Sequence, residues 1–215
     1  MKTPNQISVI ALAILLLFAS CSRTKKEYWD NGKLQSEMSY KEGKLEGKAT
    51  WYYDNGVKEQ EVFYRKNKLD GKLTRWHKNG NPESESNYVN GKLEGKALSF
   101  DMNGNKVLEE TYVDDTLNGP YFLYYPNGQV KVEGHYKDGF FTGRWLYYHP
   151  DGKIIGTGTF EHGSGIQKAW WPNGKLKREV SYKDNLKNGE DRIYDENGRL
   201  ETILKYEAGV LVKKN

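Results

Sequence analysis

Aromatic and polar residues alternate along this chain in short runs, and the runs recur at a fixed spacing. Tight-turn pairs, Asn-Gly or Asp-Gly, begin at residues 31, 55, 79, 103, 127, 151, 173 and 197, so the period is 24 residues with one interval of 22. An aromatic residue stands three positions before every pair, and another stands eight positions after every glycine. Short runs bounded by turn signals at this spacing predict one β-hairpin per period and an all-β, elongated antiparallel repeat array.

The turn sequences also predict the register of each hairpin. In 126–128, Pro-Asn-Gly, the proline presets the first central position of a type I turn and the glycine takes the left-handed position after it. This three-residue loop places Tyr52 opposite Lys58 in the equivalent hairpin. Strict alternation along both strands would then put Tyr124 and Tyr136 on the same face. The expectation is one aromatic face along the whole array.

A second turn recurs between hairpins. One column holds only residue types that tolerate a left-handed backbone: Gly43, Asn67, Gly91, Asp115, Gly139, Gly163, Asn185 and Gly209. A Leu or Phe two positions later in most units is expected to pack onto the aromatic face. The opposite face is expected to carry a column of acids, which we interpret as an ordinary solvated ladder among Lys and Arg: Glu37, Glu61, Glu85, Glu109, Glu133 and Glu179.

The composition and the distribution of charge narrow the classes of function that this protein can have. The chain is 29% charged with a formal net charge of +4, and its acids and bases are interspersed. A nucleic-acid-binding surface needs a basic stripe, which this pattern lacks. Two of the four histidines, His77 and His149, occupy a column otherwise mainly aromatic, and we find no nucleophile, zinc or phosphate-loop spacing. The prediction is a protein that is not an enzyme and uses no cofactor or metal.

The run 43–56, Gly-Lys-Leu-Glu-Gly-Lys-Ala-Thr-Trp-Tyr-Tyr-Asp-Asn-Gly, resembles the MORN repeat (membrane occupation and recognition nexus). It looks most like the bacterial variant found in YwqK-type antitoxins, and the resemblance covers about residues 28–212. It implies an extended β array that binds proteins or lipids without catalysis. Trp-Tyr-Tyr followed by glycine also resembles choline- and glucan-binding repeats, which keeps carbohydrate binding open as an alternative.

The N-terminus reads as an export signal. Residues 1–6 carry Lys2 and no acid, 7–18 are apolar except for one serine, and Ala19-Ser20-Cys21 follows. A twelve-residue apolar run is too short to span a bilayer but suits a signal peptide. Small residues before the only cysteine resemble the bacterial lipobox, which implies lipidation of Cys21. The serine after it favours the outer membrane by the same resemblance, facing the periplasm or the cell surface.

The expected organisation is a signal peptide (1–20), a short tether (21–27), the repeat array (28–212) and a tail (213–215). We expect a membrane-anchored binding or scaffold protein of the cell envelope with a protein partner. One specific form is an antitoxin or immunity protein that neutralises a toxin by direct binding.

A candidate partner-binding patch lies in the middle of the array, where the first strands become rich in Tyr and Trp. Alternation places these side chains on the acid-bearing face as an exposed apolar patch. The alternative is that the sheet curls there and the rings pack against the array itself. The candidate residues are Tyr121, Tyr125, Trp145, Tyr147 and Trp171.

Overall fold

The computed structural model describes residues 22–214, and within this range every regular element is a β-strand. Cys21 and the predicted signal peptide lie outside the described residues. The strands are β1 (Ser22–Tyr28), β2 (Leu34–Lys41), β3 (Lys44–Tyr52), β4 (Lys58–Arg65), β5 (Lys68–Leu69), β6 (Gly71–Trp76), β7 (Pro82–Val89), β8 (Lys92–Leu93), β9 (Gly95–Phe100), β10 (Lys106–Val113), β11 (Thr116–Leu117), β12 (Gly119–Tyr124), β13 (Val130–Lys137), β14 (Phe140–Tyr148), β15 (Ile154–Glu161), β16 (Ser164–Trp170), β17 (Leu176–Lys183), β18 (Leu186–Tyr194), β19 (Leu200–Glu207) and β20 (Val210–Lys214).

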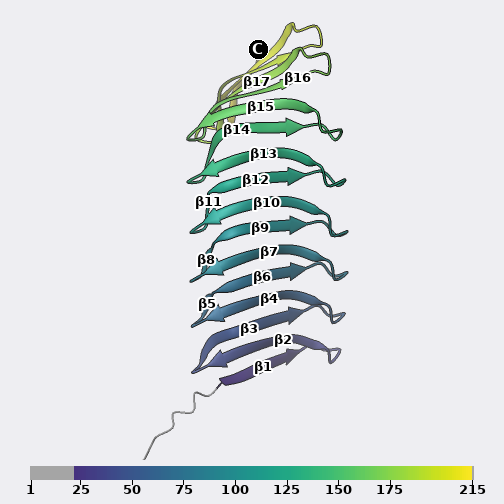
Figure 1. Cartoon of the computed structure of the whole chain (residues 1–215), viewed down its shortest axis with the longest axis vertical. Coiled ribbons are helices and arrows are strands. Elements are labelled where there is room, and N and C mark those ends of the chain that lie inside the picture. The colour runs from purple at the N-terminus through teal and green to yellow at the C-terminus, as the bar shows by residue number, and fades with distance from the viewer. Residues whose placement is uncertain (1–21, 215) are drawn as a thin grey trace, which may run out of the picture.

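These strands form one antiparallel sheet in which the hairpins follow one another in chain order, as the ladder in Figure 1 shows. Each pair of strands joined by an Asn-Gly or Asp-Gly turn is a unit, numbered one to eight from the N-terminus. In units three to five the first strand is interrupted, which gives β5/β6, β8/β9 and β11/β12, and β20 begins a further hairpin. The predicted all-β hairpin array is therefore confirmed.

Both predicted turns are present. In unit two the Tyr53 amide donates to the Val57 carbonyl and the Gly56 amide donates to the Tyr53 carbonyl, each at 2.8 Å. With Gly56 at φ 91°, this is a type I turn followed by a left-handed glycine. The second turn is a two-residue loop with positive φ at both central positions, as at Glu42 (52°) and Gly43 (78°), which is the type I′ pattern that suits the twist of a hairpin.

The prediction of a single aromatic face is wrong, although the turn that led to it is right. Tyr52 does face Lys58, but the next pair is Trp51 with Gln60, so Glu59 is an extra residue on the second strand. This β-bulge shifts the alternation by one position. The same β-bulge follows the Asn-Gly or Asp-Gly turn of every unit, and in unit five it places Tyr124 and Tyr136 on opposite faces.

We call the two sides of the sheet the inner and the outer face. The inner face carries the aromatic column of Tyr64 and Tyr136, and the outer face carries the acids together with the other aromatic column. Tyr148, for example, donates from its hydroxyl to Glu133 at 2.7 Å on the outer face. The buried hydrophobic side chains among the described residues all belong to the inner face: Ala49, Val62, Leu73, Trp145, Phe160 and Val180.

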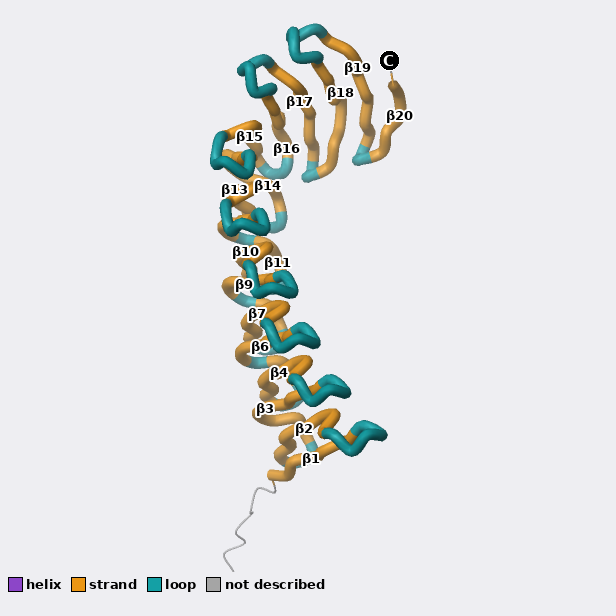
Figure 2. The backbone as a smooth tube through the Cα atoms, turned by 90° about the vertical axis from the view of Figure 1, so that its right-hand side faces the viewer, coloured by secondary structure: helices purple, strands orange, loops and turns teal. Residues whose placement is uncertain are grey.

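The sheet changes direction near the sixth unit. Figure 2 shows β1–β15 stacked in a column seen along the strands, whereas β16–β20 spread out as a fan seen broadside. The rings of Phe141 on β14 and Tyr182 on β17 lie 6.4 Å apart, although three strand spacings in a flat sheet would be about 14 Å. The sheet therefore curls around its inner face at the unit that is two residues shorter than the others.

Candidate functional site

The structure places the core of the predicted patch inside the protein. Trp145 is only 4% exposed and lies on the inner face, with ring centroids 5.5 Å from Tyr121 and 5.2 Å from Tyr136. Tyr147 shares this face, where burial raises its pKa well above the ordinary value of 10.0. The expectation of an exposed patch on the acid-bearing face is thus wrong for these residues, and the alternative in which the rings pack against the array describes them.

Tyr121, Trp145 and their neighbours form what we call the aromatic cluster. It continues the smaller core of the N-terminal units, which centres on Ala49, Val62 and Leu73. The ring centroids of Phe141 and Trp145 lie 4.8 Å apart, so the apolar residue after the second turn does pack inward, as expected. The members of the aromatic cluster are Tyr121, Tyr136, Phe141, Trp145, Phe160 and Tyr182.

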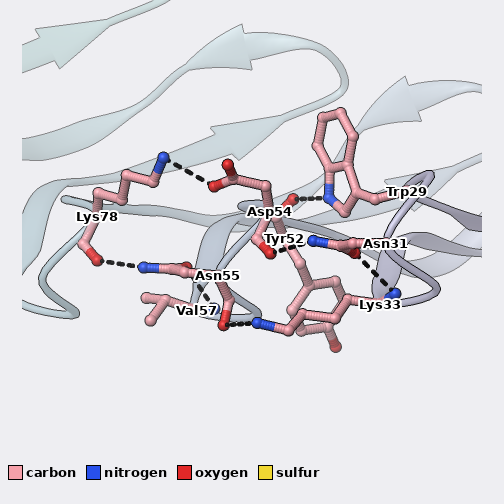
Figure 3. Close-up of polar contacts among 8 residues, drawn as sticks. All are labelled: Trp29, Asn31, Lys33, Tyr52, Asp54, Asn55, Val57 and Lys78. Carbon is pink, nitrogen blue, oxygen red and sulfur yellow. Dashed lines mark hydrogen bonds and ion pairs between the residues drawn. The ribbon is translucent and has the colours of Figure 1, made fainter.

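The two remaining candidates, Tyr125 and Trp171, lie at the Asn-Gly turns and act as clamps between units. Figure 3 shows the same arrangement in unit one, where the indole Nε1 of Trp29 donates to the Tyr52 carbonyl at 3.0 Å and the side-chain amide of Asn31 donates to the Asp54 carbonyl at 2.9 Å. The turn of unit one is thereby hydrogen-bonded to the turn of unit two. Where such contacts recur, they tie consecutive units along one edge of the array.

Two kinds of clamp can be distinguished: one is made by the side chain two positions before the Asn-Gly or Asp-Gly turn, and the other by the turn asparagine itself. The first kind always reaches the carbonyl of the residue 23 positions later and is made by Trp29, Tyr53, His77, Tyr125 and Trp171. Within residues 22–214, the junctions after units four and six lack both kinds of clamp. In unit four, Asp101 instead accepts amides of its own turn. In unit six, His149 lies 3.0 Å from the carboxylate of Asp151 and does not reach the next unit.

A cleft of about 630 Å³ opens at the junction after unit six. This volume is in the range of ligand-binding clefts. Ile154 and Ile155 are 48% and 39% exposed, and Trp170 and Trp171 approach from the following unit. The complete lining is His149, Asp151, Lys153, Ile154, Ile155, Trp170, Trp171, Pro172 and Gly174.

The aromatic wall of this cleft is held rigidly. The indole Nε1 of Trp171 donates to the Tyr194 carbonyl at 3.1 Å, and the ammonium of Lys177 lies 4.2 Å from the centre of the same ring. A side chain fixed from two sides needs little ordering when a ligand binds. The cleft can therefore present a preformed apolar surface.

Asp151 supplies the negative charge at the rim of the cleft. The backbone amide of Lys153, then the Lys153 ammonium and His149, lower the pKa of the Asp151 carboxyl to about 2. It is therefore ionised at neutral pH. The cleft combines two indoles and two isoleucines with one fixed carboxylate and a nearby ammonium, an arrangement that can bind a ligand.

The sequence holds signals that could have identified this cleft. The interval of 22 residues between Asp151 and Asn173 marks the short unit. Ile155 occupies the bulge position, where most other units carry a polar residue, such as Glu59 and Glu83. An apolar bulge residue next to the one irregular spacing is a combination that the aromatic pattern alone did not reveal.

No cluster of His, Cys, Asp or Glu in the described range could hold a metal ion. The same residues contain no helix of the length and hydropathy needed to cross a membrane.

Comparison with known families gives one match, to the MORN repeat variant. It recurs six times and together covers more than half of the chain, at residues 24–42, 45–66, 69–90, 117–138, 141–162 and 164–184. No curated protein matches the chain.

Proposed function

Because this chain belongs to the MORN repeat variant family, we propose that it is a non-catalytic binding protein whose partner site is the cleft after unit six. The partner we propose is a protein that inserts an apolar side chain between Ile155 and Trp171. The observation that carries the proposal is the coincidence of a missing clamp and a large apolar cleft at the same junction. Trp and Tyr side chains that are fixed before binding are preferred anchors in protein interfaces.

The test uses a photo-crosslinking amino acid placed at Ile155 in the full chain, expressed in its own cells. Glu83 holds the equivalent position in unit three and is the matched control. We expect a discrete protein adduct from position 155 and none of the same size from position 83.

Two tryptophan variants make this experiment specific. Trp171→Ala and Trp29→Ala remove the same inter-unit hydrogen bond, but only Trp171 lines the cleft. The adduct should disappear with Trp171→Ala and persist with Trp29→Ala. If both variants keep the adduct, or if both lose it, the cleft is not the binding site.

Attachment to the cell envelope is part of the same proposal and rests on the N-terminal sequence alone. Replacing Cys21 with alanine should remove the acylated residue, so the protein should move from the membrane fraction to the soluble fraction. Lipid chains contribute about 0.8 kcal/mol per buried CH₂ group, and their loss is therefore large enough to release the chain. Unchanged fractionation of Cys21→Ala would contradict lipidation.

The more specific form of this proposal is an immunity protein for a toxin that acts in the envelope. It predicts that the crosslinked partner is a toxin and that Trp171→Ala leaves the cell sensitive to it. Carbohydrate binding is the second candidate, because an indole ring beside the Asp151 carboxylate suits a sugar ring. Retention on cell-surface polysaccharide that is lost with Trp171→Ala, without any protein adduct, would favour that second candidate.

A further inference from the structure

A second cavity lies on the inner face of the fan, between β16, β17 and β18. Its volume is about 210 Å³, and its lining includes Gln167, Ala169, Arg178, Val180, Tyr182 and Lys187. It is separate from the cleft after unit six, which lies at the turn end of β16. The inference drawn from it does not depend on the proposed function.

The chemistry of this cavity is set by a buried carboxylate. Asp191 is fully buried, at an inner-face position equivalent to Ala49 and Leu73 in other units. Arg178 donates to its two oxygens from Nε at 2.7 Å and from Nη2 at 2.6 Å, and Lys187 donates at 3.1 Å. Burial alone would raise the pKa of Asp191, but these bonds outweigh it and hold the pKa below the ordinary 3.8.

The groups around Asp191 have more donors than acceptors. Both oxygens of the carboxylate accept hydrogen bonds, whereas Nη1 of Arg178 has no hydrogen-bond partner among residues 22–214. The Lys187 ammonium lies 4.7 Å from the centre of the Tyr206 ring and makes no second hydrogen bond within the same residues. The side-chain oxygen of Gln167 accepts from the Tyr182 hydroxyl at 3.0 Å, which leaves the Gln167 amide nitrogen free to donate. A guanidinium, an ammonium and an amide thus face one cavity whose lining residues include no carboxylate.

We propose that this cavity binds one carboxylate group, supplied by the C-terminus or an acidic side chain of a peptide segment. Arg178 and Lys187 carry two positive charges and Asp191 one negative charge, so the cluster has a net charge of +1. One monoanion neutralises it, whereas a phosphate dianion would place excess negative charge beside Asp191. Planar carboxylates are also well matched to a guanidinium donor.

The experiment is an NMR titration of the full chain in detergent at constant ionic strength, observing the side-chain amide of Gln167 and the Nε–H of Arg178. The probes are acetate, inorganic phosphate and two short peptides without acidic side chains, one with a free C-terminus and one amidated. We expect saturable shifts of both signals with acetate and the free-acid peptide. The amidated peptide should cause no saturable shift.

Gln167→Leu is the variant of choice because Gln167 takes no part in holding Asp191, so the fold is expected to persist. Loss of one hydrogen bond to a charged ligand should weaken acetate binding about tenfold, followed on the Arg178 signal. Gln60→Leu is the matched control, since Gln60 is an inner-face glutamine of unit two bound to Arg75 of unit three, and it should leave binding unchanged.

Three results would overturn the proposal. The first is the absence of a saturable shift with acetate, and the second is equal binding of the free-acid and amidated peptides. The third is tighter binding of phosphate than of acetate, which would assign the cavity to a different anion.

Discussion

At the scale of single residues, the packing of the aromatic cluster depends on a glycine that no turn requires. Gly134 has an ordinary extended backbone, but a β-carbon built on it would lie 2.1 Å from Cδ2 of Trp145. The indole therefore rests directly on the backbone of the neighbouring strand. Such close approach of a ring to a strand is a recognised reason for a glycine inside a sheet.

Gly134→Ala should destabilise the protein strongly. The added methyl group must push Trp145 out of its position, and overpacking of this kind costs up to about 3 kcal/mol in the free energy of unfolding, measured by chemical denaturation. His135→Ala, at the exposed neighbouring position, should change it by less than about 0.5 kcal/mol. If the clash is the cause, combining Gly134→Ala with Trp145→Leu should cost less than the sum of the two single changes.

At the scale of elements, the second turns are stacked and hydrogen-bonded to each other. Asn67 accepts the Leu45 amide of the preceding unit at 2.7 Å. Asn185 reaches over Gly163 to a turn two units away, where it accepts the Phe141 amide and donates to the Gly139 carbonyl, both at 2.8 Å. The short seventh unit brings these two turns within reach of one side chain.

Replacement of these two asparagines by alanine should therefore have unequal effects. Asn67→Ala loses one side-chain hydrogen bond and a residue that tolerates φ of 68°, and we expect a loss of about 1–2 kcal/mol in the free energy of unfolding. Asn185→Ala loses two hydrogen bonds at a similar φ of 65°, so its loss should be larger by about 1 kcal/mol. Equal losses in denaturant titrations would mean that the longer contact adds no stability.

At the scale of the whole molecule, the outer face is a ladder of ion pairs and the inner face is an apolar stripe. Glu109 is bound by Lys96 at 2.7 Å and by Lys106 at 3.0 Å, and hydrogen bonding from Lys96 contributes most to lowering its pKa below 4.5. The inner face also carries Asp191, which is the one fully buried charge among the described residues. These carboxylates make the stability of the array depend on pH.

We expect the free energy of unfolding to fall on acidification below about pH 4.5. A carboxyl whose pKa is lower in the folded than in the unfolded chain stabilises the fold above its unfolded pKa, and this contribution disappears as the pH falls through its folded pKa. Asp191→Asn should remove the part of the decrease that begins near its ordinary pKa of 3.8. An unchanged pH profile for this variant would show that Asp191 is not linked to folding.

The sequence by itself determined the repeat, both turns and the antiparallel hairpin array, because turn chemistry is local. A proline followed by Asn-Gly specifies its loop wherever it occurs, and a left-handed position selects glycine or asparagine without reference to distant residues. The type of fold, the number of units and the inward packing of Phe141 could therefore be predicted. The family match is consistent with these local signals.

Only the tertiary structure decided which side chains share a face and where the array opens. The bulge at Glu59 carries no composition signal, yet one extra residue reverses the face of every side chain beyond it. For that reason Trp145 and Tyr147 are part of the inner face and not an exposed patch. The cleft beside Trp171 likewise depends on how a two-residue deletion is absorbed by neighbouring units, which is a property of the packed array and not of any single repeat.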